Sequence, residues 1–178
     1  MGAAARSTTQ WVLRVAVASA SLATGATSTG AQATARMPRV RWENPLIAHA
    51  IAEGIERSTT FRSLVDAIDA TDGLVYVLEG TCGQGVRACL HMSVERSGEN
   101  RLLRILVNSR RAPGCELVGA IGHELQHALE ALRNPRIQNG FAMSSFFHQI
   151  GPEDTQRFET PEAERIGSAV ASEACRKH

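Results

Sequence analysis

Residues 117–130 of the chain read LVGAIGHELQHALE. The apolar residues of this segment recur at helical spacing and an Asn-Pro pair follows it, so we predict a helix over residues 116–133. His123 and His127 lie on the side of this helix that faces away from its apolar residues. The residues expected to face a hydrophobic core are Leu117, Ile121, Leu125, Ala128 and Leu132.

The same segment contains the pattern His-Glu-x-x-His at residues 123–127. Histidines four residues apart project from the same side of a helix, a little more than one turn apart, so both imidazoles can bind one metal ion. Glu124 lies about 100° around the helix from His123 and can reach a water molecule bound to that metal. A chain of this composition would contain about 0.02 such matches by chance, so the pattern indicates a metal site.

The overall composition suits one domain, alone or with a targeting segment. The chain has 178 residues, of which 43% are hydrophobic, and a chain of this size can bury a core without added cross-links. Its 19 basic and 18 acidic residues give a net charge of +1, whereas nucleic-acid-binding domains concentrate positive charge. Aromatic residues make up 4% of the chain, too few to suggest a base-stacking surface. We therefore expect no nucleic-acid partner.

The first 36 residues differ from the rest, because they contain no acidic residue and are rich in Ala, Ser, Thr and Gly. Two arginines precede a short apolar run, and the sequence Ala-Gln-Ala ends at Ala33. These are the parts of a secretory signal peptide, which we predict for residues 1–33, with a low-complexity tail as the alternative. The apolar run is too short to span a membrane, so we expect no stable membrane anchor. The mature domain, residues 34–178, would then be exported to the periplasm or the exterior of a bacterial cell.

The cysteines are Cys82, Cys89, Cys115 and Cys175, all in the predicted mature domain. An even number of cysteines in an exported chain suggests disulfides, and four cysteines allow three pairings. Cys82 and Cys89 are close in sequence, so a local loop closure between them is one option, which leaves Cys115 with Cys175. None belongs to a Cys-x-x-Cys pair, which argues against a zinc ribbon. In a cytosolic chain the cysteines would instead be small buried residues.

Hydrophobic periodicity predicts an α+β fold in which a small antiparallel sheet packs with helices. Residues 37–43 form an arginine-rich segment at the start of the domain, and residues 141–150 fit either a short helix or a lid-like loop. The turn sequence Ser97–Asn100 suits a hairpin between two strands. The predicted helices cover residues 45–55, 59–70, 116–133 and 162–176, and the predicted strands cover residues 74–78, 86–94 and 102–107.

Residues 122–128, GHELQHA, resemble the active-site helix of the zincin metallopeptidases. Metzincins, one branch of zincins, carry Gly three residues and His six residues after the second histidine, where this chain has Glu130 and Arg133. The resemblance is therefore to gluzincins, whose third zinc ligand is a glutamate on a later helix. The predicted order of elements is similar to that of minimal single-domain gluzincins of the exported bacterial type.

The resemblance implies a third zinc ligand in the segment spanning residues 158–164, which would start a C-terminal glutamate helix. We favour Glu159, because a carboxylate beside an apolar neighbour needs a partner. Glu162 and Glu164 are the alternatives, although acidic residues in the first turn of a helix also stabilise its dipole. The glutamate helix of gluzincins has Asp four residues after the ligand, whereas this chain has Ala163 there.

Two further residues are candidates for supporting roles. Glu130 is seven residues from His123, about 10 Å along the helix axis, which is too far for both to bind one ion easily. We expect it to orient a metal-binding histidine or to form a salt bridge. His148 is a candidate for stabilising a developing oxyanion, although an isolated histidine is more often a surface or core residue.

The resemblance implies a zinc-dependent metallopeptidase. Zn²⁺ bound by His123, His127 and Glu159 would activate a water molecule, and Glu124 would act as the general base. The substrate would be a peptide or protein lying against an edge strand, which we expect at Leu102–Val107, and the enzyme would be a monomer. The alternatives are an exported zinc-binding domain without turnover, and a partner-binding domain in which the two histidines face solvent by accident.

Overall fold

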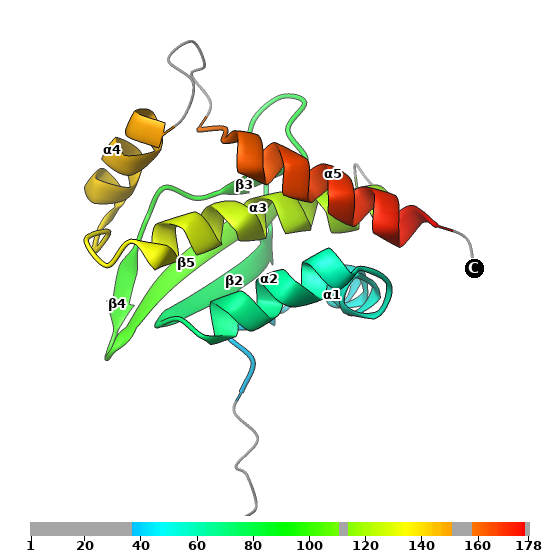
Figure 1. The fold of residues 1–178 in the computed structure, drawn as a ribbon, viewed down its shortest axis with the longest axis horizontal. Coiled ribbons are helices and arrows are strands. Elements are labelled where there is room, and N and C mark those ends of the chain that lie inside the picture. Colours follow the sequence, from blue (N-terminus) through cyan, green and yellow to red (C-terminus); the bar gives the residue numbers. More distant parts are fainter. Residues whose placement is uncertain (1–36, 111–113, 151–157, 177–178) are drawn as a thin grey trace, which may run out of the picture. The chain divides into compact units, whose positions relative to one another are not determined.

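A computed structural model describes residues 37–110, 114–150 and 158–176. The predicted signal peptide, residues 1–33, lies outside the described residues. The described elements, shown in Figure 1, are β1 (Val40–Trp42), α1 (Pro45–Arg57), α2 (Thr59–Asp69), β2 (Gly73–Glu79), β3 (Ala88–Leu90), β4 (Glu95–Ser97), β5 (Asn100–Val107), α3 (Cys115–Arg133), α4 (Gly140–Ile150) and α5 (Pro161–Cys175).

Several helices begin at residues whose side chains cap them. Asn44, Ser58 and Thr160 precede α1, α2 and α5, and each side chain accepts a hydrogen bond from a backbone N–H of the first turn. Such bonds satisfy N–H groups that have no partner inside the helix. The predicted helices are therefore confirmed to within a few residues, and the ambiguous segment at residues 141–150 is a helix, α4.

The strands form a mixed sheet with the order β1-β2-β5-β3, in which β4 also pairs with β5. β1 is parallel to β2 and β2 is parallel to β5, whereas β3 and β4 are antiparallel to β5. The predicted α+β class is confirmed, but the prediction of an antiparallel sheet is wrong. α1 and α2 lie between β1 and β2 in the chain and return it to the same end of the sheet, so these two strands run parallel.

β5 is an interior strand, so the expectation of an edge strand at Leu102–Val107 is wrong. It pairs with β2 on one side and with β3 and β4 on the other. The predicted strand over residues 86–94 is reduced to the short β3, which is the end of the strand order beside α3. The hairpin predicted at Ser97–Asn100 is confirmed, and Gly98 has a φ of 60°, which suits the first central position of a tight hairpin turn.

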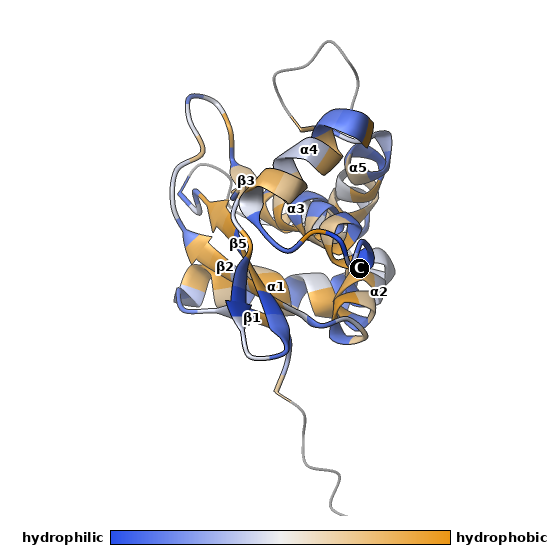
Figure 2. Cartoon of the chain, turned by 90° about the vertical axis from the view of Figure 1, so that its left-hand side faces the viewer, coloured by the Kyte–Doolittle hydropathy of each residue, from blue (hydrophilic) through white to orange (hydrophobic). Residues whose placement is uncertain are grey.

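Burial alternates along β2 and β5, so one face of the sheet carries the hydrophobic core. Val75, Val77, Leu103 and Ile105 are at most 1% exposed. α1 and α3 contact these strands, and α5 packs mainly on α3. In Figure 2, hydrophobic residues colour much of β2, β5 and the adjoining helices. The predicted core face of α3 is buried as expected, and this burial holds α3 in place against the sheet.

α3 and α5 lie in close contact because glycines occupy the surfaces where they meet. A Cβ atom added at Gly167 would lie 2.9 Å from the Cβ atom of His123, and one added at Gly122 would lie 3.0 Å from the Val170 side chain. Any larger residue would push the two helices apart. The close approach brings the segment just before α5 alongside the middle of α3, where His123 is located.

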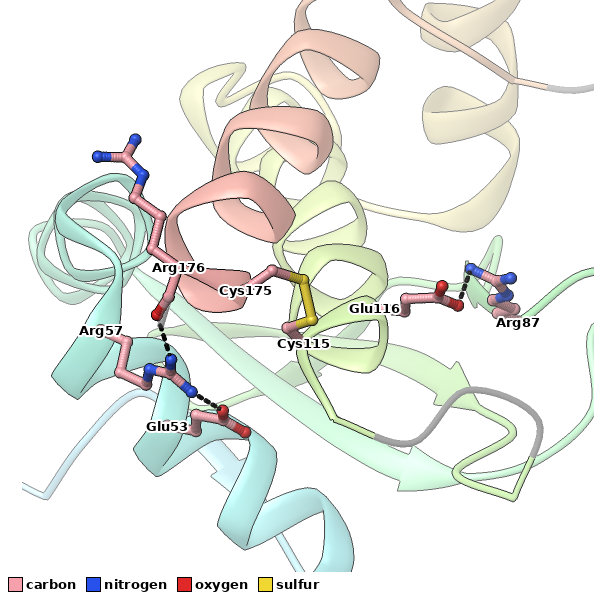
Figure 3. The surroundings of a disulfide bond; sticks show 7 residues. All are labelled: Glu53, Arg57, Arg87, Cys115, Glu116, Cys175 and Arg176. Atoms are coloured by element: carbon pink, nitrogen blue, oxygen red, sulfur yellow. Dashed lines mark hydrogen bonds and ion pairs between the residues drawn. A yellow bond between two sulfur atoms is a disulfide. The ribbon is translucent and has the colours of Figure 1, made fainter. Parts of the chain in front are cut away.

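Both disulfides that the spacing suggested are present, Cys82–Cys89 and Cys115–Cys175. The second joins the first residue of α3 to the last residue of α5 (Figure 3). Two disulfides fit a protein that is located outside the cytoplasm. Within the described ranges, no helix is both long enough and apolar enough to cross a membrane.

Candidate metal centre

α3 presents two histidine side chains to one point in space. The Nε2 atoms of His123 and His127 are 3.1 Å apart. The side chain of His127 is 5% exposed and that of His123 is 20% exposed. Their spacing of four residues on a helix produces this geometry, as the sequence predicts.

Glu159 reaches the same point from the segment just before α5. Its Oε2 atom lies 3.0 Å from Nε2 of His123 and 3.8 Å from Nε2 of His127. The alternatives are not brought to the histidines: Glu162 forms an exposed ion pair with Arg165, and Glu164 is an exposed residue of α5. In the described part of the chain, one group of three or more His, Cys, Asp or Glu residues is close enough to hold a metal ion, and it consists of His123, His127 and Glu159.

The arrangement of these three atoms fits a metal ion. Ligand atoms about 2.0–2.1 Å from a tetrahedral ion would be spaced about 3.3 Å apart, and the observed distances are 3.0, 3.1 and 3.8 Å. Oε2 of Glu159 is buried and has no hydrogen-bond partner. A buried carboxylate oxygen without a donor is costly unless a cation is bound to it. The three residues could therefore hold a metal ion, and the donor set alone does not identify the metal.

Glu130 supports the centre from behind His127. The Nδ1–H group of His127 donates a hydrogen bond to Oε2 of Glu130 over 3.1 Å, which keeps Nε2 directed at His123 and Glu159. Oε1 of Glu130 accepts hydrogen bonds from Gln126 (3.2 Å) and Thr160 (2.9 Å). Glu130 thus lies where the sequence suggested, beside a histidine and outside the ligand group.

The sequence did not identify Gln126 or Thr160 as parts of the site. Thr160 caps α5 through its contact with the Ala163 N–H and also donates to Glu130, so it connects the start of α5 to α3. The available signal was the Thr160-Pro161 pair, which predicts a helix start but says nothing about a contact with another helix. Gln126 had a signal in its spacing, since residues four apart on a helix are neighbours.

The electrostatics of the metal-free centre reflect the proximity of acids and imidazoles. Burial alone would lower the pKa of His127, but the hydrogen bond to Glu130 and the nearby carboxylate of Glu159 raise it to about 9. The imidazoles of His123 and His127, which face its carboxylate, hold the pKa of Glu159 well below its usual range. Because a metal ion binds the unprotonated imidazole, metal binding at neutral pH must release the proton of His127.

Glu124 lies beside the centre and is 8% exposed. The backbone N–H of Leu90 in β3 donates a hydrogen bond of 2.7 Å to its Oε2 atom. Burial raises the pKa of Glu124, while the nearby His127 and His123 oppose that increase. No described residue donates to Oε1. The contact with Leu90 joins two distant parts of the chain, and the sequence pattern did not indicate it.

Two cavities adjoin the centre. One, of about 420 Å³, is bordered by His127 and Glu159, and the other, of about 730 Å³, is bordered by His123. Ala88 and Glu124 border both cavities. The centre is therefore accessible from two directions along β3.

α4 covers part of the centre without contributing a ligand. Phe147 is buried, and its ring packs against the ring of His127 with centroids 5.4 Å apart. His148, the candidate for stabilising an oxyanion, is an exposed residue whose ring packs on Phe158 at 4.8 Å. It is not among the residues that border either cavity. The structure therefore does not bring His148 together with Glu124 and the histidines.

Comparisons with protein-family models, with curated proteins and with solved structures give no match.

Proposed function

We propose that the protein is an exported zinc-dependent metallopeptidase. One observation carries this proposal: His123, His127 and Glu159 converge on a single point, and the carboxylate of Glu124 lies next to the histidines on the same helix. A metal site that is purely structural normally has four protein ligands, whereas three ligands leave a position for water. The carboxylate that follows the first histidine supplies the base that such a water requires.

Zinc is the metal that best suits this donor set. Two imidazoles and one carboxylate are ligands that zinc accepts in catalytic sites with an open position. When bound, zinc would lower the pKa of a water molecule to about 7 and polarise the carbonyl oxygen of a substrate. The residues of the chain would then divide the remaining work.

Glu124 would take the proton of the attacking water and transfer it to the leaving amine. The hydrogen bond from Leu90 to Oε2 holds the carboxylate against β3 and leaves Oε1 for the proton. Glu130 would fix the ring of His127 with its Nε2 atom toward the centre. Both contacts reduce the freedom of groups that must stay in place during the reaction.

The substrate would lie along β3. Every second residue along β3 forms backbone hydrogen bonds with the β5 side. At the two ends of β3, the His91 N–H bonds to Arg104 and the Arg87 C=O bonds to Asn108. The main-chain groups of Ala88 and Leu90 therefore point to the other side, where Leu90 contacts Glu124. An extended peptide can add to such an edge through backbone hydrogen bonds. In this proposal the edge strand that binds the substrate is β3, whereas the sequence indicated β5.

Metal content and turnover test the proposal. We expect protein produced from the full chain to contain about one zinc ion per chain and to hydrolyse peptides. Glu124→Gln should keep the zinc and abolish hydrolysis, because the amide cannot accept the proton. Glu162→Gln is the matched control, since this exposed residue contacts only Arg165 among the described residues, and it should retain full activity.

The other outcomes separate the alternatives. Protein without zinc after refolding with excess metal would contradict both a catalytic and a structural zinc site. Protein that binds zinc but hydrolyses no peptide would be a zinc-binding domain without turnover. Hydrolysis that survives Glu124→Gln would show that the general base is another residue.

A further inference from the structure

The two cavities beside the candidate metal centre differ in chemistry. The cavity of about 730 Å³ includes Arg87 and Glu116, which form an ion pair over 3.0 Å (Figure 3), and the acidic Glu164. The cavity of about 420 Å³ is bordered, apart from Gln84 and the site residues Glu124, His127 and Glu159, by apolar groups and cysteines. These are Cys82, Val86, Ala88, Cys89, Leu90, Met92 and Phe158.

A disulfide forms part of the wall of this smaller cavity. Cys82 and Cys89 both border it, and the bond between them closes the loop that connects β2 to β3. Gly83 and Gly85 in this loop have φ values of 97° and 80°, which favour glycine. No backbone hydrogen bond joins residues 81–86 to another part of the described chain. The disulfide is therefore the main connection that holds this part of the cavity wall.

We propose that the smaller cavity binds a bulky apolar side chain of the peptide substrate, and that the Cys82–Cys89 disulfide maintains the shape of this subsite. The inference rests on the proposed peptidase function. The position follows from continuity, because Glu124, His127 and Glu159 border the cavity directly. A volume of about 420 Å³ accommodates a Leu, Met or Phe side chain with part of its backbone.

Exposed charges away from the metal centre disfavour the larger cavity as the apolar subsite. An apolar side chain placed there would cover the Arg87–Glu116 ion pair and the carboxylate of Glu164, and it would remove water from charged groups that need it. In the smaller cavity, the same side chain would replace water that contacts Val86, Met92 and Phe158, which is favourable. The two cavities thus predict opposite preferences.

A peptide set tests the preference. Peptides of the form Ala-Ala-Xaa-Ala-Ala, with Xaa as Gly, Leu, Met, Phe, Lys or Glu, are incubated with the zinc-loaded protein and the products are identified by mass spectrometry. We expect cleavage next to Leu, Met or Phe to exceed cleavage of the Gly peptide by at least about tenfold in kcat/KM. Cleavage without such a preference would overturn the inference and leave the peptidase function intact.

A binding experiment separates the two proposals if no peptide is cleaved. The Leu and Gly peptides are titrated into zinc-loaded Glu124→Gln protein, and binding is followed by NMR. Tighter binding of the Leu peptide, with shifts at Val86 and Met92, would support the apolar subsite even though the peptidase proposal had failed. Equal binding of the two peptides would overturn the subsite as well.

Two variants connect the preference to the cavity wall. Val86→Asp places a carboxylate in the cavity, and we expect it to lower kcat/KM for the Leu peptide by about tenfold relative to Thr81→Asp. Thr81 is an exposed residue of the same loop and is not among the residues bordering either cavity. Equal effects of the two substitutions would contradict the assignment.

The disulfide has its own matched comparison. The double variant Cys82→Ser, Cys89→Ser should raise KM for the Leu peptide and leave KM for the Gly peptide almost unchanged. The double variant Cys115→Ser, Cys175→Ser should lower the melting temperature more, because its bond closes a longer loop, without changing the preference. A preference that is unaltered by the loss of Cys82–Cys89 would show that the disulfide does not shape the subsite.

Discussion

α3 contributes to two polar clusters, and only one of them is satisfied by the protein itself. At the C-terminal end of α3, Arg101 from β5 is 3% exposed and donates hydrogen bonds to Asp72 and to four backbone carbonyl groups. In the middle of α3, two imidazole nitrogens and one carboxylate oxygen face one another. The carboxylate oxygen there is buried without a hydrogen-bond donor.

The difference separates a structural cluster from a binding site. Arg101 donates to carbonyl groups at and just after the end of α3, where the helix itself supplies few N–H donors, so this cluster stabilises the fold. In the histidine cluster, unprotonated imidazole nitrogens and a carboxylate oxygen face one another, and all of them are acceptors. A proton or a metal ion between them is needed to make this arrangement favourable. We therefore expect substitutions in the first cluster to change stability, and substitutions in the second to change metal affinity.

Arg101→Met should have the largest effect on stability. It removes the donors that reach the Leu132 and Ile137 carbonyls and leaves Asp72 without its ion-pair partner, at a cost of about 4 kcal/mol in the free energy of unfolding. Urea unfolding of the metal-free protein measures this change. Arg104→Met is the control, because Arg104 pairs with the exposed Glu95 on the surface and should cost less than about 1 kcal/mol. Similar losses of unfolding free energy for both variants would show that the buried Arg101 contributes no more stability than a surface arginine.

Glu159→Ala should show the opposite behaviour. We expect zinc affinity to fall by more than about a hundredfold, since a ligand should matter more than a supporting residue. The free energy of unfolding of the metal-free protein should change by less than about 1 kcal/mol, because the Glu159 side chain as a whole is 34% exposed and solvent screens its contacts with the histidines. Competition with a chromogenic chelator measures the affinity, with Glu162→Ala as the control. Unchanged affinity would contradict the assignment of Glu159 as a ligand.

Glu130→Gln should have an intermediate effect on the metal site. Gln keeps the size of the side chain and a carbonyl oxygen that can accept from Nδ1 of His127, but it lacks the negative charge. We expect zinc affinity to decrease by about tenfold. The dissociation constant is measured beside the unfolding free energy of the metal-free protein. A loss of stability with no loss of affinity would mean that Glu130 only joins α3 to Thr160.

The sequence predicted local features better than contacts between distant segments. The spacing of His123 and His127 determines their geometry because one helix carries both, and the Cys82–Cys89 pair is similarly local. Strand direction was wrong because the alternation of apolar residues indicates which face of a strand is buried but not which strand is its partner. The burial of Arg101 was not predicted either, since its acceptors lie about 30 residues away on another element.

The prediction of Glu159 as a ligand depends both on a local sequence pattern and on a contact between distant segments. The resemblance to gluzincins implied a ligand in residues 158–164, but spacing alone could not distinguish the three glutamates there. The choice depends on the close contact of α3 with α5, which Gly122 and Gly167 permit. Once α5 lies against α3, the residue just before the helix reaches the histidines, and Glu162 and Glu164 are directed elsewhere.

A third cluster extends the comparison to the surface and should show the smallest effect. Glu173 of α5 accepts hydrogen bonds from Ser58 and from the backbone and hydroxyl groups of Thr60 at the start of α2. Burial alone would raise the pKa of Glu173, but these bonds lower it to about 2. The carboxylate therefore stabilises the folded state at a pH above its ordinary value near 4.5, and this stabilisation is lost as the pH falls toward 2.

Glu173→Gln tests this sign directly. The variant should be less stable than the wild type by about 1 kcal/mol at pH 6, a small value because solvent screens the partly exposed carboxylate. The difference should shrink between pH 4.5 and pH 2, where the wild-type carboxylate becomes protonated. Urea unfolding at pH 6 and pH 3 measures it. A difference that does not change with pH would mean that Glu173 contributes through packing, and that the cluster is satisfied without its charge.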